Sequence, residues 1–201
     1  MSSIATTPET AVEGGRPSGM SMPLLGMVLF IASEVMFFGG LFGAYFNIRA
    51  DAGNNWPPAG LELEELHWHL PGLFTVVLII SSFTLHLALH AIKRGNTRGL
   101  IQWTTITLIL GVIFLAGQLY DYSTLGFTIR DGVFGTTFYT LTGFHGAHVF
   151  AGLCYLFIVL VRASTGQFTR YSHAAVEGAS LYWHFVDVVW IVLFFILYVL
   201  K

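Results

Sequence analysis

Five stretches of the sequence are almost continuously apolar, and most polar residues lie in the segments that join them. Each stretch has at least the 20 or so residues that a helix needs to cross a bilayer core of about 30 Å. The apolar residues do not alternate with polar ones as in barrel strands, and lipid offers backbone groups no partners, so we expect helices. The pattern predicts an all-α integral membrane bundle with five transmembrane helices, at about residues 24–46, 70–92, 100–121, 137–161 and 179–200.

Two longer polar segments lie outside these stretches. Residues 1–20 are rich in Ser, Thr, Gly and Pro and lack the apolar core of a signal peptide, so we expect a disordered polar tail before a membrane domain at 21–201. The longest connection, residues 47–69, contains the string WPP at 56–58 and an acidic run. The acidic residues are Glu62, Glu64 and Glu65. The remaining connections are short and leave no room for a soluble domain.

The basic residues between the predicted helices indicate the orientation of the chain. Because the number of spans is odd, the two ends of the chain lie on opposite sides of the membrane. One side would receive six basic residues, Arg16, Lys93, Arg94, Arg98, Arg162 and Arg170. The other side would receive three, Arg49, Arg130 and Lys201. Since cytoplasmic segments carry the excess of Lys and Arg, we expect a cytoplasmic N-terminus and an external C-terminus.

The composition agrees with a membrane protein and excludes several other classes. Charged residues make up 10% of the chain, against about 25% in soluble domains. A formal net charge of −2 provides no basic surface for a nucleic acid. Cys154 is the only cysteine, so neither an intramolecular disulfide nor a cysteine-based zinc site can form. The sequence also lacks the nucleotide-binding, serine-hydrolase and kinase motifs.

Glu34 lies in the middle of the first apolar stretch. A charged group at the bilayer centre costs several kcal/mol, so its presence there requires a reason. One interpretation is a protonated carboxyl group that bonds to a neighbouring helix. The other is a group that takes part in proton movement or contacts a partner protein, and the sequence leaves both open.

The last apolar stretch carries His184 and Asp187, which lie three residues apart and share one helix face. We expect these two residues to form a polar clamp to another helix, in an inner layer that also includes Glu34. Aromatic residues flank the pair. Trp183 and Trp190 suit the aromatic belt at a membrane interface, so we expect them to contact lipid or a partner.

A second polar layer is expected nearer the external side. Gln118 and Asp121 are three residues apart at the end of the third stretch, and His145 and His148 are three residues apart in the fourth. Chain direction places both pairs in the outer half of their helices. The sequence therefore predicts hydrogen bonds between the third and fourth helices, which would fix the register of the helices more than drive their assembly.

Paired histidines can also present two ligands to one metal ion. The pair at 86 and 90 lies near the inner end of its helix, at a different depth from the pair in the fourth stretch. His90 is close to Arg94 and is expected to meet a lipid phosphate or water. We therefore expect no metal on this chain, and an autonomous membrane metalloprotein or cytochrome stays a remote alternative.

Five strings of the sequence carry a resemblance to a known family. The strings are SEVMFF at 33–38, WPP at 56–58, FTIRDGVFG at 127–135, TGFHGAHV at 142–149 and YWHFVDVVW at 182–190. In this order they resemble subunit III of the haem–copper oxidases, and the last two strings are highly specific to that family. The resemblance covers about residues 24–200 and is closer to the cytochrome c oxidases than to the quinol oxidases.

The resemblance implies a non-catalytic subunit of a proton-pumping aa3-type cytochrome c oxidase, which reduces oxygen to water in aerobic respiration. In that family the haem and copper centres belong to subunits I and II, so this chain would hold no cofactor of its own. It would pack mainly against subunit I, support proton uptake and stable turnover, and hold phospholipid in a cleft. Cytochrome c would donate electrons to the complex.

The resemblance also extends to single residues. Glu34 matches the family's intramembrane glutamate, and His90 matches a histidine at the inner end of the corresponding helix. The other matches are His145, His148, His184, Asp187 and Trp190.

Two features depart from the family pattern. Longer members have seven spans and this chain lacks the first two, which favours a prokaryotic plasma membrane over the mitochondrial inner membrane. Asp121 stands where the family usually has Glu. A subunit-III-like accessory protein of nitric oxide reductase, or of a quinol oxidase, remains an alternative.

Overall fold

The computed structural model describes residues 21–53, 56 and 69–200. Within these ranges it contains five long helices, and each is long and apolar enough to cross a membrane. They are α1 (Met22–Ala52), α2 (His69–Lys93), α3 (Thr97–Thr124), α4 (Gly132–Ser164) and α5 (Ala174–Phe194), and α5 continues into a π-helical turn, η3 (Phe195–Val199). The predicted all-α class with five spans is therefore confirmed. The predicted tail at 1–20 and the acidic run at 62–65 lie outside the described residues.

Every helix is longer than the apolar stretch that predicted it when η3 is counted as the end of α5. The largest differences are in α1, which continues to Ala52, and in α4, which begins at Gly132. Polar residues can continue a helix beyond the hydrocarbon core, because helical hydrogen bonds do not depend on the apolarity of the side chains. The apolar pattern thus marks the part of each helix inside the membrane and leaves the helix ends undefined.

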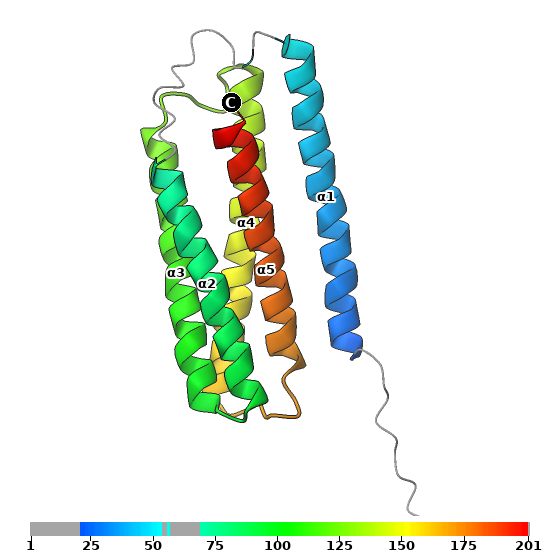
Figure 1. Cartoon of the computed structure of the whole chain (residues 1–201), viewed down its shortest axis with the longest axis vertical. Coiled ribbons are helices and arrows are strands. Elements are labelled where there is room, and N and C mark those ends of the chain that lie inside the picture. Colours follow the sequence, from blue (N-terminus) through cyan, green and yellow to red (C-terminus); the bar gives the residue numbers. More distant parts are fainter. Residues whose placement is uncertain (1–20, 54–55, 57–68, 201) are drawn as a thin grey trace, which may run out of the picture.

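Helices α2 to α5 pack side by side, and α1 lies along α5 and α4 at the edge of this group (Figure 1). Only Phe38 and Tyr45 of α1 are buried. Among the five helices, α5 with η3 has the largest buried share of its most apolar window, since α5 contacts α1, α2 and α4. The core of the protein therefore surrounds α5, and α1 keeps most of its surface free for lipid or protein.

A tight turn joins α2 to α3. Gly95 has a φ of +80°, in the left-handed region that favours glycine, and its N–H donates to the Ile92 carbonyl oxygen. The side chain of Asn96 then accepts a hydrogen bond from the N–H of Gly99 at 2.9 Å and caps α3. Because the turn is short, α2 and α3 are held as an antiparallel pair along their whole length.

Trp183 is the largest fully buried side chain of the core. Gly111 of α3 and Gly152 of α4 make room for its indole ring. A Cβ atom built on Gly111 would lie 2.7 Å from Cη2 of Trp183, and one on Gly152 would lie 2.9 Å from Cε3. Both distances are shorter than van der Waals contact, so these two glycines allow three helices to close around one ring.

Candidate functional site

The clearest polar contact within the membrane-spanning part joins α1 to α4. Nε2 of His148 lies 2.9 Å from Oε2 of Glu34, and both side chains are mostly buried. Nδ1 of the same ring lies 2.7 Å from the carbonyl oxygen of Phe144. Since a carbonyl oxygen only accepts, Nδ1 carries a proton and donates it. One further proton therefore lies between Nε2 and the carboxylate, on either atom.

Aromatic rings surround this pair. The ring of Phe38 meets the His148 imidazole edge-on with centroids 5.0 Å apart, and the ring of Phe37 stacks on it at 6.2 Å. Phe37 is partly exposed on the outside of the bundle, whereas Phe38 is buried. The shared proton is thus held close to the protein surface but within an apolar surrounding.

The partner of Glu34 corrects one prediction. We expected Glu34 in a layer with His184 and Asp187, and His148 nearer the external side. Helix α4 begins at Gly132 and ends at Ser164, so His148 lies at its midpoint. His148 also lies beside the midpoint of the predicted stretch 137–161, so the prediction was wrong because it assigned each residue to an outer or inner half and did not compare the depths of the two residues.

The predicted polar layer between α3 and α4 is present, with partners that the sequence did not indicate. Nε2 of Gln118 donates to the carbonyl oxygen of Thr142 at 2.8 Å. The hydroxyl of Tyr122 donates to Oγ1 of Thr142 at 2.7 Å and also lies 3.2 Å from the Gln118 amide. These bonds connect α3 and α4 through one amide and two hydroxyl groups.

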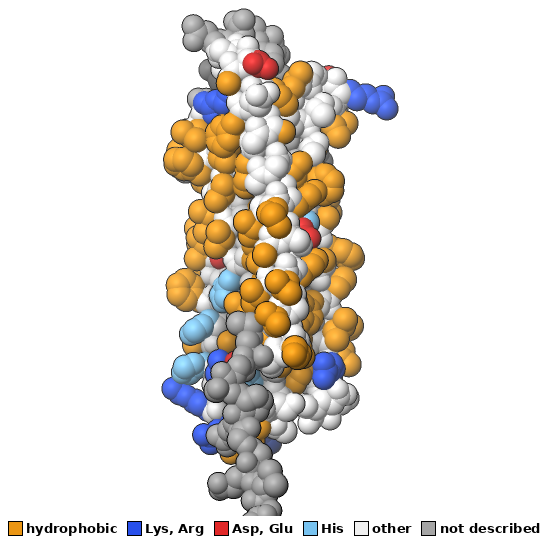
Figure 2. All heavy atoms as spheres, turned by 90° about the vertical axis from the view of Figure 1, so that its right-hand side faces the viewer, with side chains coloured by type: hydrophobic (Ala, Val, Ile, Leu, Met, Phe, Trp, Pro, Cys, Tyr) orange, Lys and Arg blue, Asp and Glu red, His pale blue; other side chains and the backbone are white. Residues whose placement is uncertain are grey.

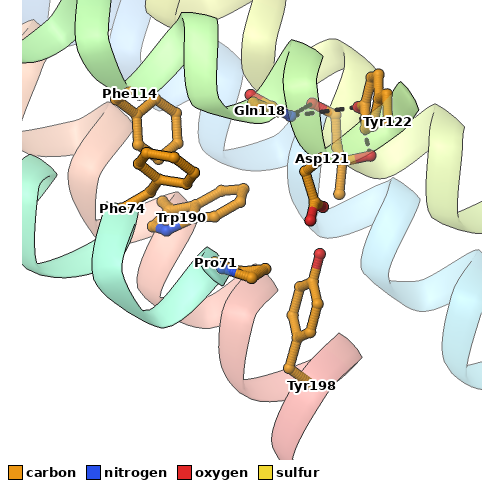
Figure 3. A pocket seen from close by; sticks show the side chains of 9 residues that line it. Pro71, Phe74, Phe114, Gln118, Asp121, Tyr122, Trp190 and Tyr198 are labelled. Atoms are coloured by element: carbon orange, nitrogen blue, oxygen red, sulfur yellow. Dashed lines mark hydrogen bonds between the residues drawn. The ribbon is translucent and has the colours of Figure 1, made fainter. Parts of the chain in front are cut away.

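Asp121 faces in another direction. Its carboxyl group points toward the hydroxyl of Tyr198 in η3 (Figure 3). A small cavity of about 10 Å³ lies among these groups, close to the volume that a single water molecule requires. Its lining also includes Pro71, Gln118 and Trp190. Asp121 therefore belongs to a contact between α3 and the end of the chain.

His145 is fully buried, but it does not join the polar layer. Its ring stacks on Trp190 with centroids 5.0 Å apart and meets Phe114 edge-on at 5.9 Å. Neither ring nitrogen has a hydrogen-bond partner among the described residues. The contacts of His145 within this chain are thus those of an aromatic core residue.

A third polar cluster lies between α2 and α5. Oδ2 of Asp187 accepts a hydrogen bond from the hydroxyl of Ser82 at 2.8 Å. His184 and Asp187 interact electrostatically, and His86 of α2 lies on the same surface. The four side chains, together with Ile79 and Phe83, line an open groove of about 350 Å³. The predicted clamp from α5 to another helix is present, and Ser82 is its partner.

The two tryptophans of α5 correct a further prediction. Trp183 is 1% exposed and Trp190 is 3% exposed, so neither offers a surface to lipid. The indole N–H of Trp183 donates to Oγ of Ser81 at 2.9 Å, and that of Trp190 donates to Oγ1 of Thr75 at 2.9 Å. Each indole is accommodated in the core because a small hydroxyl residue of α2 satisfies its only donor.

Most charged side chains gather at the two ends of the molecule, and a largely apolar belt separates them (Figure 2). At the end where α2 stops, Nζ of Lys93 lies 2.9 Å from Oε1 of Glu177 at the start of α5. His90 and Arg94 are exposed at the same end.

The segment before α4 is folded around an aspartate. Oδ2 of Asp131 accepts hydrogen bonds from the backbone N–H of Thr128 at 2.6 Å and from its hydroxyl at 2.9 Å. The N–H of Thr128, followed by its hydroxyl, lowers the pKa of Asp131 below its usual value. A Cβ on Gly135 would lie 2.3 Å from the Thr128 carbonyl oxygen, which explains why this string of the sequence contains glycine there.

The residues that sequence reasoning missed share one property. They are small hydroxyl residues and tyrosines within the apolar stretches or directly after one, and their type alone gave no signal. They are Thr75, Ser81, Ser82, Tyr122, Thr142 and Tyr198. Among the described residues, no group of three or more His, Cys, Asp or Glu side chains converges on a point that could hold a metal ion.

Comparison with known proteins identifies the class of protein that this arrangement belongs to. Residues 9–201 match the family model described as cytochrome c oxidase subunit III. The chain is 44% identical to cytochrome c oxidase subunit 3 of Thermostichus vulcanus, over 88% of this chain and 87% of that protein. It is 42% identical to the probable cytochrome c oxidase subunit 3 of Mycobacterium tuberculosis, over the full length of both chains.

A third relative, cytochrome c oxidase subunit 3 of Synechocystis, is 44% identical over all of this chain and 84% of its own length. Family match and identity both extend over most of the chain, and the helices agree with a multi-pass membrane protein. The protein belongs to the cytochrome c oxidase subunit III family.

Proposed function

We propose that this chain is the non-catalytic subunit III of a proton-pumping aa3-type cytochrome c oxidase in a bacterial plasma membrane. In this proposal it packs mainly against subunit I, and the haem and copper centres lie in subunits I and II. The observation that carries the proposal is that polar groups within the membrane-spanning helices bond to other helices of this chain. Glu34, Gln118 and Asp187 each bond to a residue of another helix of this chain, so they serve helix packing.

The proposed support of stable turnover rests on the Glu34–His148 contact. The pair shares a proton close to the outer surface of the bundle, and it connects α1 to α4. Helix α1 packs mainly against α5, and this hydrogen bond adds a polar link from α1 to α4. Loss of the attachment would change the surface that the chain presents to the catalytic subunits, and thereby proton uptake through them.

Phospholipid binding is proposed at the end of the bundle where α2 stops. His90 and Arg94 are exposed there, next to apolar side chains that acyl chains can cover. Six basic residues assigned to this side against three on the other support its cytoplasmic location. Anionic headgroups at the cytoplasmic face would meet these cations.

The proposal is tested by purification of a tagged chain in mild detergent, with mass spectrometry of the bound proteins and an optical spectrum. We expect oxidase subunits I and II in stoichiometric amounts, haem absorbance in the complex, and none in the chain once it has been separated. Co-purification with nitric oxide reductase subunits would contradict the proposal. So would a stoichiometric haem or metal ion on the separated chain.

A second measurement addresses turnover. Oxidase purified with and without this chain should start with comparable oxygen consumption, but the complex without it should lose activity within fewer turnovers. Equal inactivation of the two preparations would refute the proposed support of turnover without affecting the assignment to the complex.

A further inference from the structure

We propose that the small cavity between α3 and the C-terminal turn η3 is a binding site for one water molecule, which bridges the carboxyl group of Asp121 and the hydroxyl of Tyr198. The cavity lies near the end of α3, where η3 approaches it. All the groups involved belong to this chain, so the inference does not rest on the proposed function. It assigns a ligand to the cavity and gives the C-terminal turn a defined attachment.

The first argument is a buried hydroxyl group without a direct partner. Tyr198 is only 6% exposed, and a buried phenolic O–H normally has a hydrogen-bond partner. Its hydroxyl faces the Asp121 carboxyl group, and the two groups interact electrostatically (Figure 3). Their arrangement falls outside the geometry of a direct hydrogen bond, and none joins them in Figure 3. A polar contact of this kind is where a bridging water molecule is expected.

The second argument is that both groups can be reached by water. Some buried polar atoms of this bundle have neither a partner nor accessible surface, and Oε1 of Gln118 and Oδ1 of Asp187 are two of them. No ligand could bond to such atoms without a movement of the helices. The oxygens of Asp121 and Tyr198 lack a direct bond but do not belong to this group, so each keeps surface on which water can bind.

The third argument is the size of the cavity. Its volume of about 10 Å³ is close to the lower limit for one water molecule. Acyl chains of lipid or detergent are too large for it. A metal ion needs several ligands, and within the described part of the chain no three His, Cys, Asp or Glu side chains converge. Water is the ligand that fits.

The lining of the cavity supplies the two to four or so hydrogen bonds that a buried water molecule makes. The water accepts the O–H of Tyr198 and donates one hydrogen to Asp121. Tyr122 lines the same cavity, and its hydroxyl oxygen is an acceptor for the second hydrogen, because its own hydrogen goes to Thr142. Trp190 forms a further wall, and its N–H is already bonded to α2. Since water both donates and accepts, the bridge serves Asp121 with or without a proton.

The bridge attaches the last turn of the chain to α3. This turn is π-helical, and the N–H of Leu200 donates to the Phe195 carbonyl oxygen at 2.9 Å. The guanidinium group of Arg49 in α1 donates to the carbonyl oxygen of Leu200. Turn η3 is therefore connected to α1 by a direct hydrogen bond and to α3 through the water molecule. One water molecule thus takes part in holding this end of the bundle together.

The direct test is a structure of the purified protein, with the subunits that accompany it, at a resolution that shows ordered water. We expect one density peak within hydrogen-bond distance of both Asp121 and Tyr198. In Asp121→Glu the carboxyl group reaches one methylene further, so it should occupy the cavity, bond to Tyr198 directly and abolish the peak. A direct bond between Asp121 and Tyr198 in the original protein, with no peak beside it, would overturn the proposal.

Hydrogen exchange of the amides of η3 provides a second readout. Tyr198→Phe removes the hydroxyl and keeps the ring, so the protection of these amides should fall about three- to thirty-fold, the loss expected for one interhelical hydrogen bond. Asp121→Glu should keep the protection. Tyr120→Phe is the matched control and should change nothing, because Tyr120 is 62% exposed next to Asp121. Unchanged protection in Tyr198→Phe would show that its hydroxyl makes no link, and would contradict the proposal.

Discussion

Glu34 of α1 and His148 of α4 share a proton across the gap between their helices, with Nε2 and Oε2 2.9 Å apart. The two residues are 114 positions apart in the sequence. The pair is only partly covered by this chain, since Phe37 beside it is exposed. It is therefore both a link between two helices and a polar group near the protein surface.

Glu34→Gln should leave the complex assembled. The Gln amide can donate to Nε2 of His148 while Nδ1 continues to donate to Phe144, so the link between α1 and α4 is kept. Glu34→Leu removes the bond, worth about 0.6 to 2 kcal/mol, and should release α1 more readily to proteolysis. Limited proteolysis and the yield of intact complex check this. A complex that falls apart in Glu34→Gln would show that the ionised carboxylate itself is required.

Gly111→Ala should destabilise the protein by about 1 to 3 kcal/mol, as overpacking of a core does. The added methyl group would meet Trp183 and Leu153 at 2.7 Å. Gly26→Ala is the matched control, because nothing lies within 4 Å of its added Cβ on α1. Thermal unfolding of the purified complex should show a lower midpoint for subunit III in the first variant only. An unchanged midpoint in both would show that α3 can move away from the indole ring.

Ser81→Ala should cost about 1 to 3 kcal/mol, because it leaves the buried indole N–H of Trp183 without an acceptor. Trp183→Phe in the Ser81→Ala background should lose less than the sum of the two single changes, since the ring no longer has a donor to satisfy. A double-mutant cycle of thermal stability measures this coupling. Simple additivity of the two changes would mean that the hydrogen bond contributes nothing.

The segment before α4 should loosen in acid. The pKa of Asp131 is lowered by the N–H and hydroxyl of Thr128, so its folded-state pKa lies below its unfolded value of 3.8. The resulting stabilisation is fully present above the unfolded pKa and is lost as the pH falls through the folded pKa. The protection of residues 125–131 from hydrogen exchange, taken relative to the intrinsic exchange rate at each pH, should therefore fall below about pH 4.

Asp131→Asn is the control for this dependence. It should show less protection at neutral pH and no further loss of protection in acid, because its amide does not titrate. A variant that retains the acid response would assign the response to another group.

The sequence predicted the membrane class and the number of spans, because each segment that crosses the hydrocarbon core must be long and predominantly apolar. It predicted the partners of polar residues poorly. Glu34 was assigned to the wrong layer because His148 was placed in the outer half of its stretch, although it lies beside the middle of that stretch. We expected Trp183 to contact lipid or a partner because tryptophan commonly lies at membrane interfaces. The hydroxyl of Ser81 accepts the indole hydrogen bond and allows the ring to be buried, but a serine within an apolar stretch gave no sign of this role. Such pairs depend on helix rotation and register, which only packing decides.

The large separation between Glu34 and His148 has a consequence for biosynthesis. At 5 to 20 residues per second, the ribosome needs on the order of 10 s to reach the histidine after it has made the glutamate. During that interval the first helix is already available for insertion, with an acid that has no counterpart from its own chain. Membrane insertion of the nascent protein must tolerate this lone acid, and the interval is one in which an insertase or another newly made membrane protein can engage it first.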